Sequence, residues 1–232
     1  MVQNVGAVIP AAGQGVRLGG STSKAFVALA GQPLILHTLK ALEATPAIRW
    51  VVVAVRQADR AAMQRLVRSQ RLTKVTTLVI GGSTRAQSVI RGIAVLPAKA
   101  EWVLVHDGAR PCLTRRLLQQ TIAHARRYGA VACGLPASLT VKAVDQAHTV
   151  RLTLDRDSLW FMQTPQVFRR DWLVETLARM DHQLDTMPDD AALLEWAGFP
   201  VHVVPGDPLN IKVTTKEDLL LAEAIMRRRN TK

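Results

Sequence analysis

A glycine-rich loop near the start of the chain is followed closely by cationic side chains. Residues 10–20 read PAAGQGVRLGG, which includes Arg17, and Lys24 comes shortly after them. Small residues let backbone N–H groups approach an anion closely, and the two mobile positive charges add to the attraction. This combination predicts a cradle for a polyphosphate.

Two familiar phosphate-binding motifs do not fit this loop. A dinucleotide-binding fingerprint needs Gly or Ala where Leu18 stands, and an acidic residue where Arg56 and Gln57 end the second strand. A Walker loop needs Lys directly after its last glycine, but Ser21 follows there. A flexible glycine turn that merely closes a strand–helix unit leaves the two cations unexplained.

Two further loops carry side chains suited to phosphate chemistry. Residues 81–85 read GGSTR with Ser88 one turn on, and they place hydroxyls at the expected start of a helix, although a simple helix cap explains them equally well. Residues 106–111 read HDGARP and put the carboxylate of Asp107 directly after an expected strand. Such an aspartate can orient Mg²⁺ or a ribose hydroxyl, and Arg110 can pair with a phosphate, whereas a simple turn is the alternative.

Short apolar runs alternate with amphipathic stretches along most of the chain. We expect strands at 5–10, 50–55, 75–80, 102–106, 130–135, 201–204 and 210–213, and helices at 34–44, 58–69, 85–96, 114–128, 170–182, 189–197 and 216–228. This order predicts an α/β fold with a doubly wound, mostly parallel sheet of the Rossmann-like type. Ligands bind at the carboxyl ends of such strands, where these loops lie. A fourth loop, residues 210–214 (NIKVT), presents Lys212 before the last helix, which alone is a weak signal.

The pattern changes between residues 138 and 159. Two short alternating segments, 140–144 and 149–154, indicate a two-stranded β-arm. An isolated hairpin is only marginally stable in water, so the arm is expected to pack on a second copy of the chain or on its own body. With no internal repeat or low-complexity linker, we interpret residues 1–232 as a single domain with a projecting arm.

Composition places the chain among globular proteins. Of its 232 residues 48% are hydrophobic and 21% charged, and no apolar run approaches the roughly 20 residues of a membrane span. The start of the chain lacks a signal-peptide pattern, and Cys112 and Cys133 are expected to be free thiols, so a cytoplasmic location is expected. The net charge of +12, from 30 basic and 18 acidic residues, favours polyanionic ligands without identifying them.

Taken together, several segments resemble one enzyme family. These are residues 10–24, Gly81–Gly82, 105–111, Asp155–Arg156, 164–166 (TPQ) and 210–214, in an order similar to that of the 2-C-methyl-D-erythritol 4-phosphate cytidylyltransferases. The resemblance spans roughly residues 5–228. It implies that CTP and 2-C-methyl-D-erythritol 4-phosphate are converted to 4-diphosphocytidyl-2-C-methyl-D-erythritol and pyrophosphate, in the non-mevalonate route to isoprenoid precursors. It also implies Mg²⁺ as cofactor and a homodimer formed through the β-arm, with no nucleic acid or membrane as partner.

The resemblance also assigns roles to individual residues. Arg17 and Lys24 would stabilise the pentavalent transition state, while Lys212 and Arg156 hold the sugar phosphate, Arg156 serving the neighbouring subunit. Nucleotide binding is implied for Pro10, Ala11, Ala12, Gly13, Gly15, Gly81, Gly82, Ser83, Ser88, Asp107 and Gly108. Acceptor binding is implied for Asp107, Arg110, Thr140, Arg156 and Thr164. Asp107 is the one expected metal contact, since Mg²⁺ would be held mainly by the CTP phosphates.

Three positions depart from the family pattern. Ser83 stands where an acidic residue commonly follows the paired glycines, Leu139 where Asp commonly precedes Thr140, and Pro188 where Thr commonly precedes an acidic pair. These departures leave open a cytidylyltransferase for another alditol phosphate, such as ribitol 5-phosphate. A basic nucleic-acid-binding module is a more distant alternative, which predicts steeply salt-dependent DNA or RNA binding and no need for Lys24.

Overall fold

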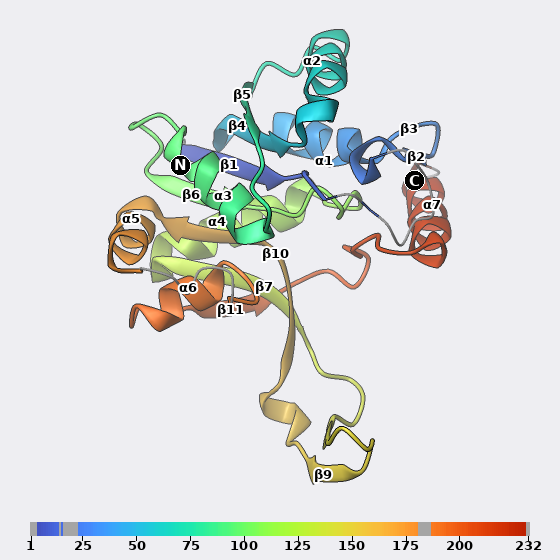
Figure 1. The fold of residues 1–232 in the computed structure, drawn as a ribbon, viewed down its shortest axis with the longest axis vertical. Coiled ribbons are helices and arrows are strands. Elements are labelled where there is room, and N and C mark those ends of the chain that lie inside the picture. The colour runs from blue at the N-terminus through green and yellow to red at the C-terminus, as the bar shows by residue number, and fades with distance from the viewer. Residues whose placement is uncertain (1–3, 14, 16–22, 181–186, 231–232) are drawn as a thin grey trace.

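A twisted seven-stranded sheet forms the centre of the body (Figure 1). The computed structural model describes residues 4–13, 15, 23–180 and 187–230. Along the sheet the strands follow the order β11-β7-β10-β6-β1-β4-β5, and all except β10 run parallel. Their bounds are β1 (Val5–Pro10), β4 (Ile48–Val55), β5 (Val75–Ile80), β6 (Trp102–Val105), β7 (Ala130–Pro136), β10 (Trp160–Arg169) and β11 (His202–Pro205). The predicted doubly wound, mostly parallel α/β sheet is confirmed.

Helices cover both faces of this sheet. One face packs against α1 (Leu34–Glu43), α2 (Arg60–Ser69) and α4 (Arg115–Tyr128), and the other against α3 (Arg85–Ala94), α5 (Arg170–Arg179) and α6 (Ala191–Trp196). Strands buried from both sides must be apolar, which is why β1 and residues 50–55 of β4 read as continuous apolar runs. The last helix, α7 (Lys216–Asn230), packs beside the small β2 (Ala28–Leu29) and β3 (Gln32–Pro33) pair. Short 3₁₀ turns are η2 (Lys24–Phe26), η3 (Gln57–Asp59) and η4 (Arg156–Ser158).

Two helix starts that matter for the site are set by threonine caps. The Thr84 hydroxyl accepts a hydrogen bond from the Gln87 backbone N–H at the start of α3, and Thr114 does the same for Leu117 at the start of α4. Threonine at this position satisfies a backbone donor that the helix cannot satisfy itself. The caps therefore fix where each loop ends and its helix begins.

Strand β10 is the main difference from the sequence-based expectation, which contained no strand at 160–169. It runs antiparallel between β6 and β7, and its ladder with β7 is interrupted between Met162 and Gln166. The side chain of Gln163 instead contacts the backbone of Asp207. Regular pairing between β10 and β7 is thus interrupted where Gln163 binds the loop that contains Asp207.

The expected strand at 210–213 is wrong, because this segment is a loop. The Val213 N–H donates to the carbonyl of Ala109, and the Asn210 side chain donates to the carbonyl of Thr164. Its hydrogen bonds therefore go to the site loops and not to a strand ladder. This arrangement fixes the segment next to Asp107.

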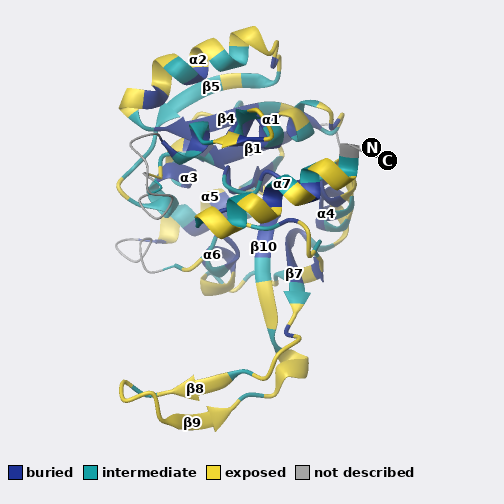
Figure 2. Cartoon of the chain, turned by 90° about the vertical axis from the view of Figure 1, so that its right-hand side faces the viewer, coloured by how far each residue is buried: buried dark blue, intermediate teal, exposed yellow. Residues whose placement is uncertain are grey.

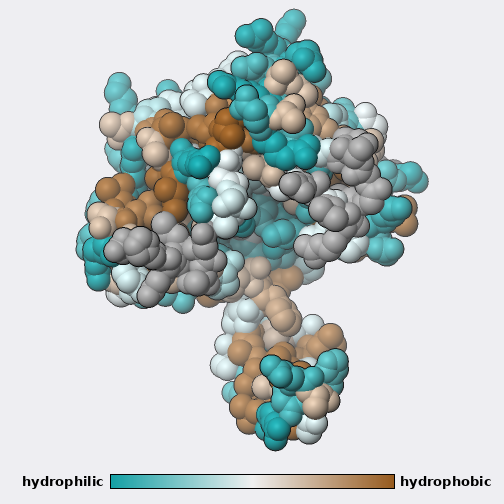
Figure 3. Space-filling view, viewed as in Figure 1, coloured by the Kyte–Doolittle hydropathy of each residue, from teal (hydrophilic) through white to brown (hydrophobic). Residues whose placement is uncertain are grey.

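The predicted β-arm leaves the body after β7 and returns through η4 into β10. It consists of β8 (Lys142–Val144) and β9 (Val150–Thr153), paired antiparallel. Figures 1 and 2 show it projecting well away from the body. Its large apolar side chains are exposed in this chain: Leu139, Val144, Val150, Leu152 and, at the base, Phe161. Figure 3 accordingly shows hydrophobic surface gathered on the arm.

Both cysteines are buried and free, as predicted. Cys112 lies in the cluster under α7, and Cys133 lies in β7. Within the described residues, no helix combines the length and apolar character needed to cross a membrane.

Candidate active site

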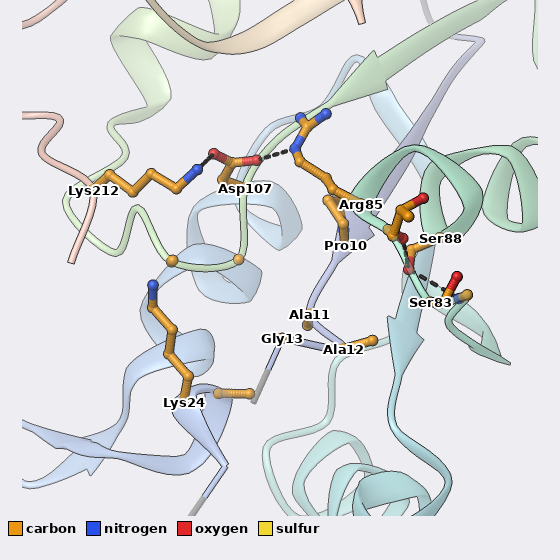
Figure 4. A pocket seen from close by; sticks show the side chains of 15 residues that line it. Pro10, Ala11, Ala12, Gly13, Lys24, Ser83, Arg85, Ser88, Asp107 and Lys212 are labelled. Carbon is orange, nitrogen blue, oxygen red and sulfur yellow. Dashed lines mark hydrogen bonds and ion pairs between the residues drawn. The ribbon is translucent and has the colours of Figure 1, made fainter. Parts of the chain in front are cut away.

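A cavity of about 230 Å³ opens at the carboxyl edge of the sheet (Figure 4). It lies between the loops that follow β1, β5 and β6, with η2 and the segment before α7 completing the wall. The lining residues are Pro10, Ala11, Ala12, Gly13, Lys24, Ala25, Gly82, Ser83, Thr84, Arg85, Ser88, Asp107, Gly108, Ala109 and Lys212. Ligands are expected at this edge of a doubly wound sheet.

Glycines let the loops around the cavity touch. A Cβ on Gly81 would lie 2.4 Å from the Cβ of Ala12, so the loops after β1 and β5 approach too closely for any side chain there. Gly15 has a φ of +69° and faces Lys24, whose Cβ would be 2.7 Å from an added Cβ. Glycine adopts this left-handed conformation without strain. Gly15 and Gly81 therefore shape the cavity from behind its surface.

Asp107 lies at the centre of the charged part of the cavity. Its carboxylate accepts from Arg85 Nε at 2.9 Å and pairs with Lys212 Nζ at 2.8 Å, while Arg110 Nε lies 3.8 Å away. Burial opposes the charge on Asp107, but Arg85 and Lys212 outweigh it and hold the pKa of this carboxyl well below its usual range. The aspartate is therefore ionised at any physiological pH.

Arg85 connects this aspartate to a second buried carboxylate. Its two terminal nitrogens donate to the two oxygens of Asp190, at 3.1 and 2.7 Å, while its Nε serves Asp107. Asp190 is only 2% exposed. Burial disfavours the guanidinium charge, yet the two carboxylates raise the pKa of Arg85 above its ordinary value. All three guanidinium nitrogens of Arg85 are thus engaged by carboxylates, and Arg85 orients Asp107 at the cavity wall.

A second chain of hydrogen bonds fixes the backbone of Asp107. The Asp107 N–H donates to the Thr164 hydroxyl at 3.0 Å, and that oxygen lies 3.1 Å from Nδ1 of His106. The His106 Nε2 lies 3.3 Å from the carbonyl of Arg110, and the Arg110 guanidinium donates to the carbonyl of Asn210 at 2.8 Å. Strand β10, the loop after β6 and the segment before α7 are thereby joined around one carboxylate.

The structure brings most of the sequence-predicted residues to the cavity, but not all. Pro10, Ala11, Ala12, Gly13, Lys24, Gly82, Ser83, Ser88, Asp107, Gly108 and Lys212 line it, while Gly15, Gly81, Arg110 and Thr164 support it from behind. Thr140 and Arg156 lie on the β-arm, exposed and away from the cavity of their own chain. Arg17 lies outside the described residues.

Sequence reasoning missed Arg85 and Asp190 as parts of the site. Arg85 stood in a loop that had been singled out, and Asp190 belongs to the acidic pair after Pro188. Neither position carries a local signal for pairing, because the partners lie 105 residues apart in the chain. The missed lining residues Ala25, Thr84 and Ala109 adjoin predicted ones.

The residues present fit a magnesium ion that is held mainly by phosphates. Asp107 offers the carboxylate oxygens in the cavity, and Mg²⁺ in nucleotide sites is commonly bound by one or two carboxylates and the substrate's phosphates. In the part of the chain that the structure describes, no group of three or more His, Cys, Asp or Glu side chains could cage a metal. The protein's share of such a site would be Asp107 alone.

Small-residue loops, two lysines and a buried aspartate at the carboxyl edge of a mostly parallel sheet define a nucleotidyltransferase of the α/β type. The sequence model of one family, IspD, 2-C-methyl-D-erythritol 4-phosphate cytidylyltransferase, matches residues 5–228. The chain belongs to this family. It is therefore an enzyme, a cytidylyltransferase of the non-mevalonate isoprenoid route.

Curated relatives carry the same description over nearly their whole length. The chain is 40% identical over 228 residues to 2-C-methyl-D-erythritol 4-phosphate cytidylyltransferase of Desulforamulus reducens, covering 98% of this chain and 97% of that relative. It is 44% identical over 220 residues to the enzyme so named from Parasynechococcus marenigrum, covering 94% and 96%.

Solved structures agree with the sequence relatives. The 4-diphosphocytidyl-2C-methyl-D-erythritol synthase of Anaerococcus prevotii is similar with a TM-score of 0.79 and 29% identity, over 96% of this chain and 98% of that one. The 2-C-methyl-D-erythritol 4-phosphate cytidylyltransferase of Thermus thermophilus gives a TM-score of 0.75 at 30% identity, over 95% and 98%.

Proposed function

We propose that this cavity binds CTP with its triphosphate at Lys24 and transfers the cytidylyl group to 2-C-methyl-D-erythritol 4-phosphate, whose phosphate is held by Lys212 together with Arg156. The observation that carries the proposal is the convergence of these two lysines, from opposite ends of the chain, on one cavity with Asp107. Backbone N–H groups of the glycine-rich loop after β1 add hydrogen-bond donors for an anion. Arg17, predicted to act beside Lys24, belongs to the same loop.

The reaction needs positioning and charge, not a protein nucleophile. A phosphate oxygen of the acceptor attacks the α-phosphorus of CTP in line, forming a new P–O bond. The bond between the α-phosphorus and the bridging oxygen breaks, and its electron pair leaves with pyrophosphate. Negative charge grows on the equatorial and leaving oxygens, where Lys24 and Arg17 stabilise it, while Lys212 holds the attacking phosphate.

Asp107 has two tasks in this scheme. It pairs with Lys212 at 2.8 Å, and its carboxylate would orient a ribose hydroxyl or help to hold Mg²⁺ when the nucleotide is bound. When bound, Mg²⁺ would neutralise part of the triphosphate charge. Arg85 and the Thr164 hydroxyl keep the carboxylate and backbone of Asp107 in place during both tasks.

The acceptor side of the site is proposed to come from a second subunit. Arg156 and Thr140 are on an arm that does not reach the cavity of its own chain, and the side chain of Arg156 is 55% exposed. The arm also exposes Leu152, 57%, and Leu139, 74%, in the absence of a covering element among the described residues. A projecting hairpin with an apolar surface is stabilised by packing on another chain. A homodimer with exchanged arms satisfies both requirements.

The cysteines take no part in this chemistry. Burial raises the pKa of the Cys112 thiol to about 11 and that of Cys133 to about 12, so both remain protonated. Their free state fits a reducing compartment, and we keep the cytoplasmic location as part of the proposal.

Pyrophosphate release with CTP, Mg²⁺ and a panel of alditol phosphates tests the proposed function. Lys24→Ala should lower kcat by about 10²–10³-fold, because a charge that stabilises the transition state is lost. Lys99→Ala, at an exposed turn before β6, is the matched control and should keep full activity. Release with ribitol 5-phosphate but none with 2-C-methyl-D-erythritol 4-phosphate would refute the proposed acceptor.

Mixed dimers test whether the arm is exchanged. When Lys24→Ala and Arg156→Ala subunits are co-expressed and purified through two different tags, each mixed dimer retains one intact site, and about half of the wild-type activity should return. If Arg156 served its own chain, both sites would lack one residue and no activity would return. Arg151→Ala, on the same arm, is the control for a general effect of losing an arginine there.

A further inference from the structure

On the wall of the cavity opposite the lysines lies the hydroxyl of Ser83, whose hydrogen is already donated to another residue of the protein. Both the N–H and the hydroxyl of Ser83 donate to the side-chain oxygen of Gln87, at 3.2 and 3.0 Å. Ser83 lines the cavity, whereas Gln87 lies behind it at the start of α3. Ser83 stands where the family pattern commonly has an acidic residue.

The chemistry of the groups fixes the direction of these hydrogen bonds. A backbone N–H only donates, so the Gln87 atom that faces Ser83 is the amide oxygen. Because that oxygen only accepts, the Ser83 hydroxyl points its hydrogen at Gln87. The Ser83 oxygen therefore presents only lone pairs to the cavity.

Gln87 is held firmly in this position. Its backbone N–H donates to the cap Thr84 at 3.2 Å, and its side chain packs so tightly on the loop that a Cβ at Gly82 would lie 2.3 Å from the Gln87 Cβ. The hydroxyl hydrogen of Ser88 is likewise already donated within the protein. Ser88 donates to the Thr84 carbonyl at 2.9 Å and accepts from the Gly82 N–H at 3.0 Å. Neither cavity hydroxyl has a hydrogen left for a ligand.

The nucleobase must meet this wall if the triphosphate meets the lysines. Figure 4 shows Lys24 and Lys212 on one side of the Ala11–Gly13 backbone and Ser83 and Ser88 on the other. The lysine side is charged, whereas Ser83 and Ser88 present hydroxyls and the nearby Arg85 guanidinium is engaged by Asp107 and Asp190. A nucleoside triphosphate placed with its phosphates on the cations directs its base toward Ser83.

We propose that Gln87 is a positioning residue that makes Ser83 an obligate acceptor, and that this acceptor selects a pyrimidine with a 4-amino group over one with a 4-oxo group. The 4-amino group of cytosine donates hydrogen bonds, whereas the 4-oxo group of uracil only accepts them. Uracil would set an oxygen against the lone pairs of Ser83, leaving both without a partner. The inference rests on the proposed function, because it assumes that the cavity holds the nucleotide.

Steady-state kinetics with CTP and UTP on full-length variants test this role. Gln87→Met keeps the length of the side chain without a strong acceptor, which frees the Ser83 hydroxyl to donate to uracil. We expect the CTP-to-UTP ratio of kcat/KM to fall about tenfold, the equivalent of one hydrogen bond, mainly through KM. Gln87→Glu retains an acceptor and should keep the wild-type ratio. Gln64→Met, on the exposed face of α2, is the matched control.

A double-mutant comparison separates this role from general structural support. In a Ser83→Ala background Gln87→Met should leave the ratio unchanged within about twofold, because its effect acts through the missing hydroxyl. Three outcomes would each overturn the proposal. The CTP-to-UTP ratio could stay unchanged in Gln87→Met, or it could fall as far in Gln87→Glu as in Gln87→Met. It could also fall fully when Gln87→Met is made in the Ser83→Ala background. If the wild-type enzyme showed no turnover of CTP, the proposed function itself would be refuted. Failure of the proposed function is thereby distinguished from failure of the role proposed for Gln87.

Discussion

Burial of His106 as a neutral ring should make the protein less stable as the pH falls below neutral, because the unfolded chain binds the proton more readily than the folded one. His106 is fully buried, and its ring joins Thr164 to the carbonyl of Arg110. Since that carbonyl only accepts, Nε2 carries the proton, and Nδ1 accepts from the Thr164 hydroxyl, whose oxygen accepts the Asp107 N–H. The bond that Nδ1 accepts from Thr164 requires a neutral imidazole. A proton on Nδ1 would remove the bond from Thr164.

The size of the effect follows from the pKa. Burial lowers the pKa of His106 from 6.5 to about 4. A histidine with a depressed pKa in the folded state binds its proton more readily when unfolded, so stability is lost as pH falls from 6.5 toward 4. The difference between the pKa of 6.5 in the unfolded chain and about 4 in the folded one corresponds to about 3 kcal/mol in total, of which about 2.5 kcal/mol should be lost by pH 4.5.

Urea unfolding at pH 7.5, 6.5, 5.5 and 4.5, followed by tryptophan fluorescence, measures this loss. Other groups titrate in the same range, so the informative quantity is the difference in pH dependence between the wild type and His106→Gln, which cannot titrate there. His148→Asn, in the exposed turn of the β-arm, controls for the loss of any histidine. Parallel loss of stability in the wild type and His106→Gln would refute the assignment of a buried neutral ring.

Three further substitutions address the frame of the site. Asp190→Asn should lower the free energy of unfolding by about 1–3 kcal/mol, because it removes one of the two carboxylates that pair with Arg85 and leaves only Asp107, and chemical denaturation would measure this. Gly92→Ala should cost about 1–3 kcal/mol, since the new methyl would lie 2.4 Å from a methyl of Val8, and a lowered Tm would show it. Leu152→Asp, on the arm, should convert the proposed dimer to a monomer in light scattering; an unchanged mass would contradict arm exchange.

The strands that are easiest to predict from the sequence are those made of apolar residues throughout. Runs such as Trp50–Val55 are apolar throughout because helices cover both faces, and the runs read directly as strands. Strand β10 escaped because Gln163, Pro165 and Gln166 interrupt its apolar pattern. The glutamines serve other elements: Gln163 contacts Asp207, and Gln166 accepts from the Ala191 N–H. Because these polar residues lie in the middle of β10, they interrupt the apolar pattern by which a strand is recognised in a sequence.

The site was predictable where it is local and unpredictable where it depends on distant pairing. The loops with Lys24, Asp107 and Lys212 stood out because small residues and charges follow expected strands, and parallel strands end at one edge. The link from Arg85 to Asp190 had no such sign. Ser83 was recognised as a departure, but its partnership with Gln87 became evident only from the hydrogen-bond directions.

The β-arm is an excursion between two strands that are neighbours in the sheet, β7 and β10. Its root is thus anchored by the sheet, while its tip contributes nothing to the core that shapes the nucleotide cavity. Under the proposed exchange of arms, mutations can alter recognition of the alcohol phosphate while the machinery for activating the triphosphate stays intact. An enzyme in which residues 138–159 are replaced by those of a relative with a different acceptor should therefore prefer that relative's acceptor.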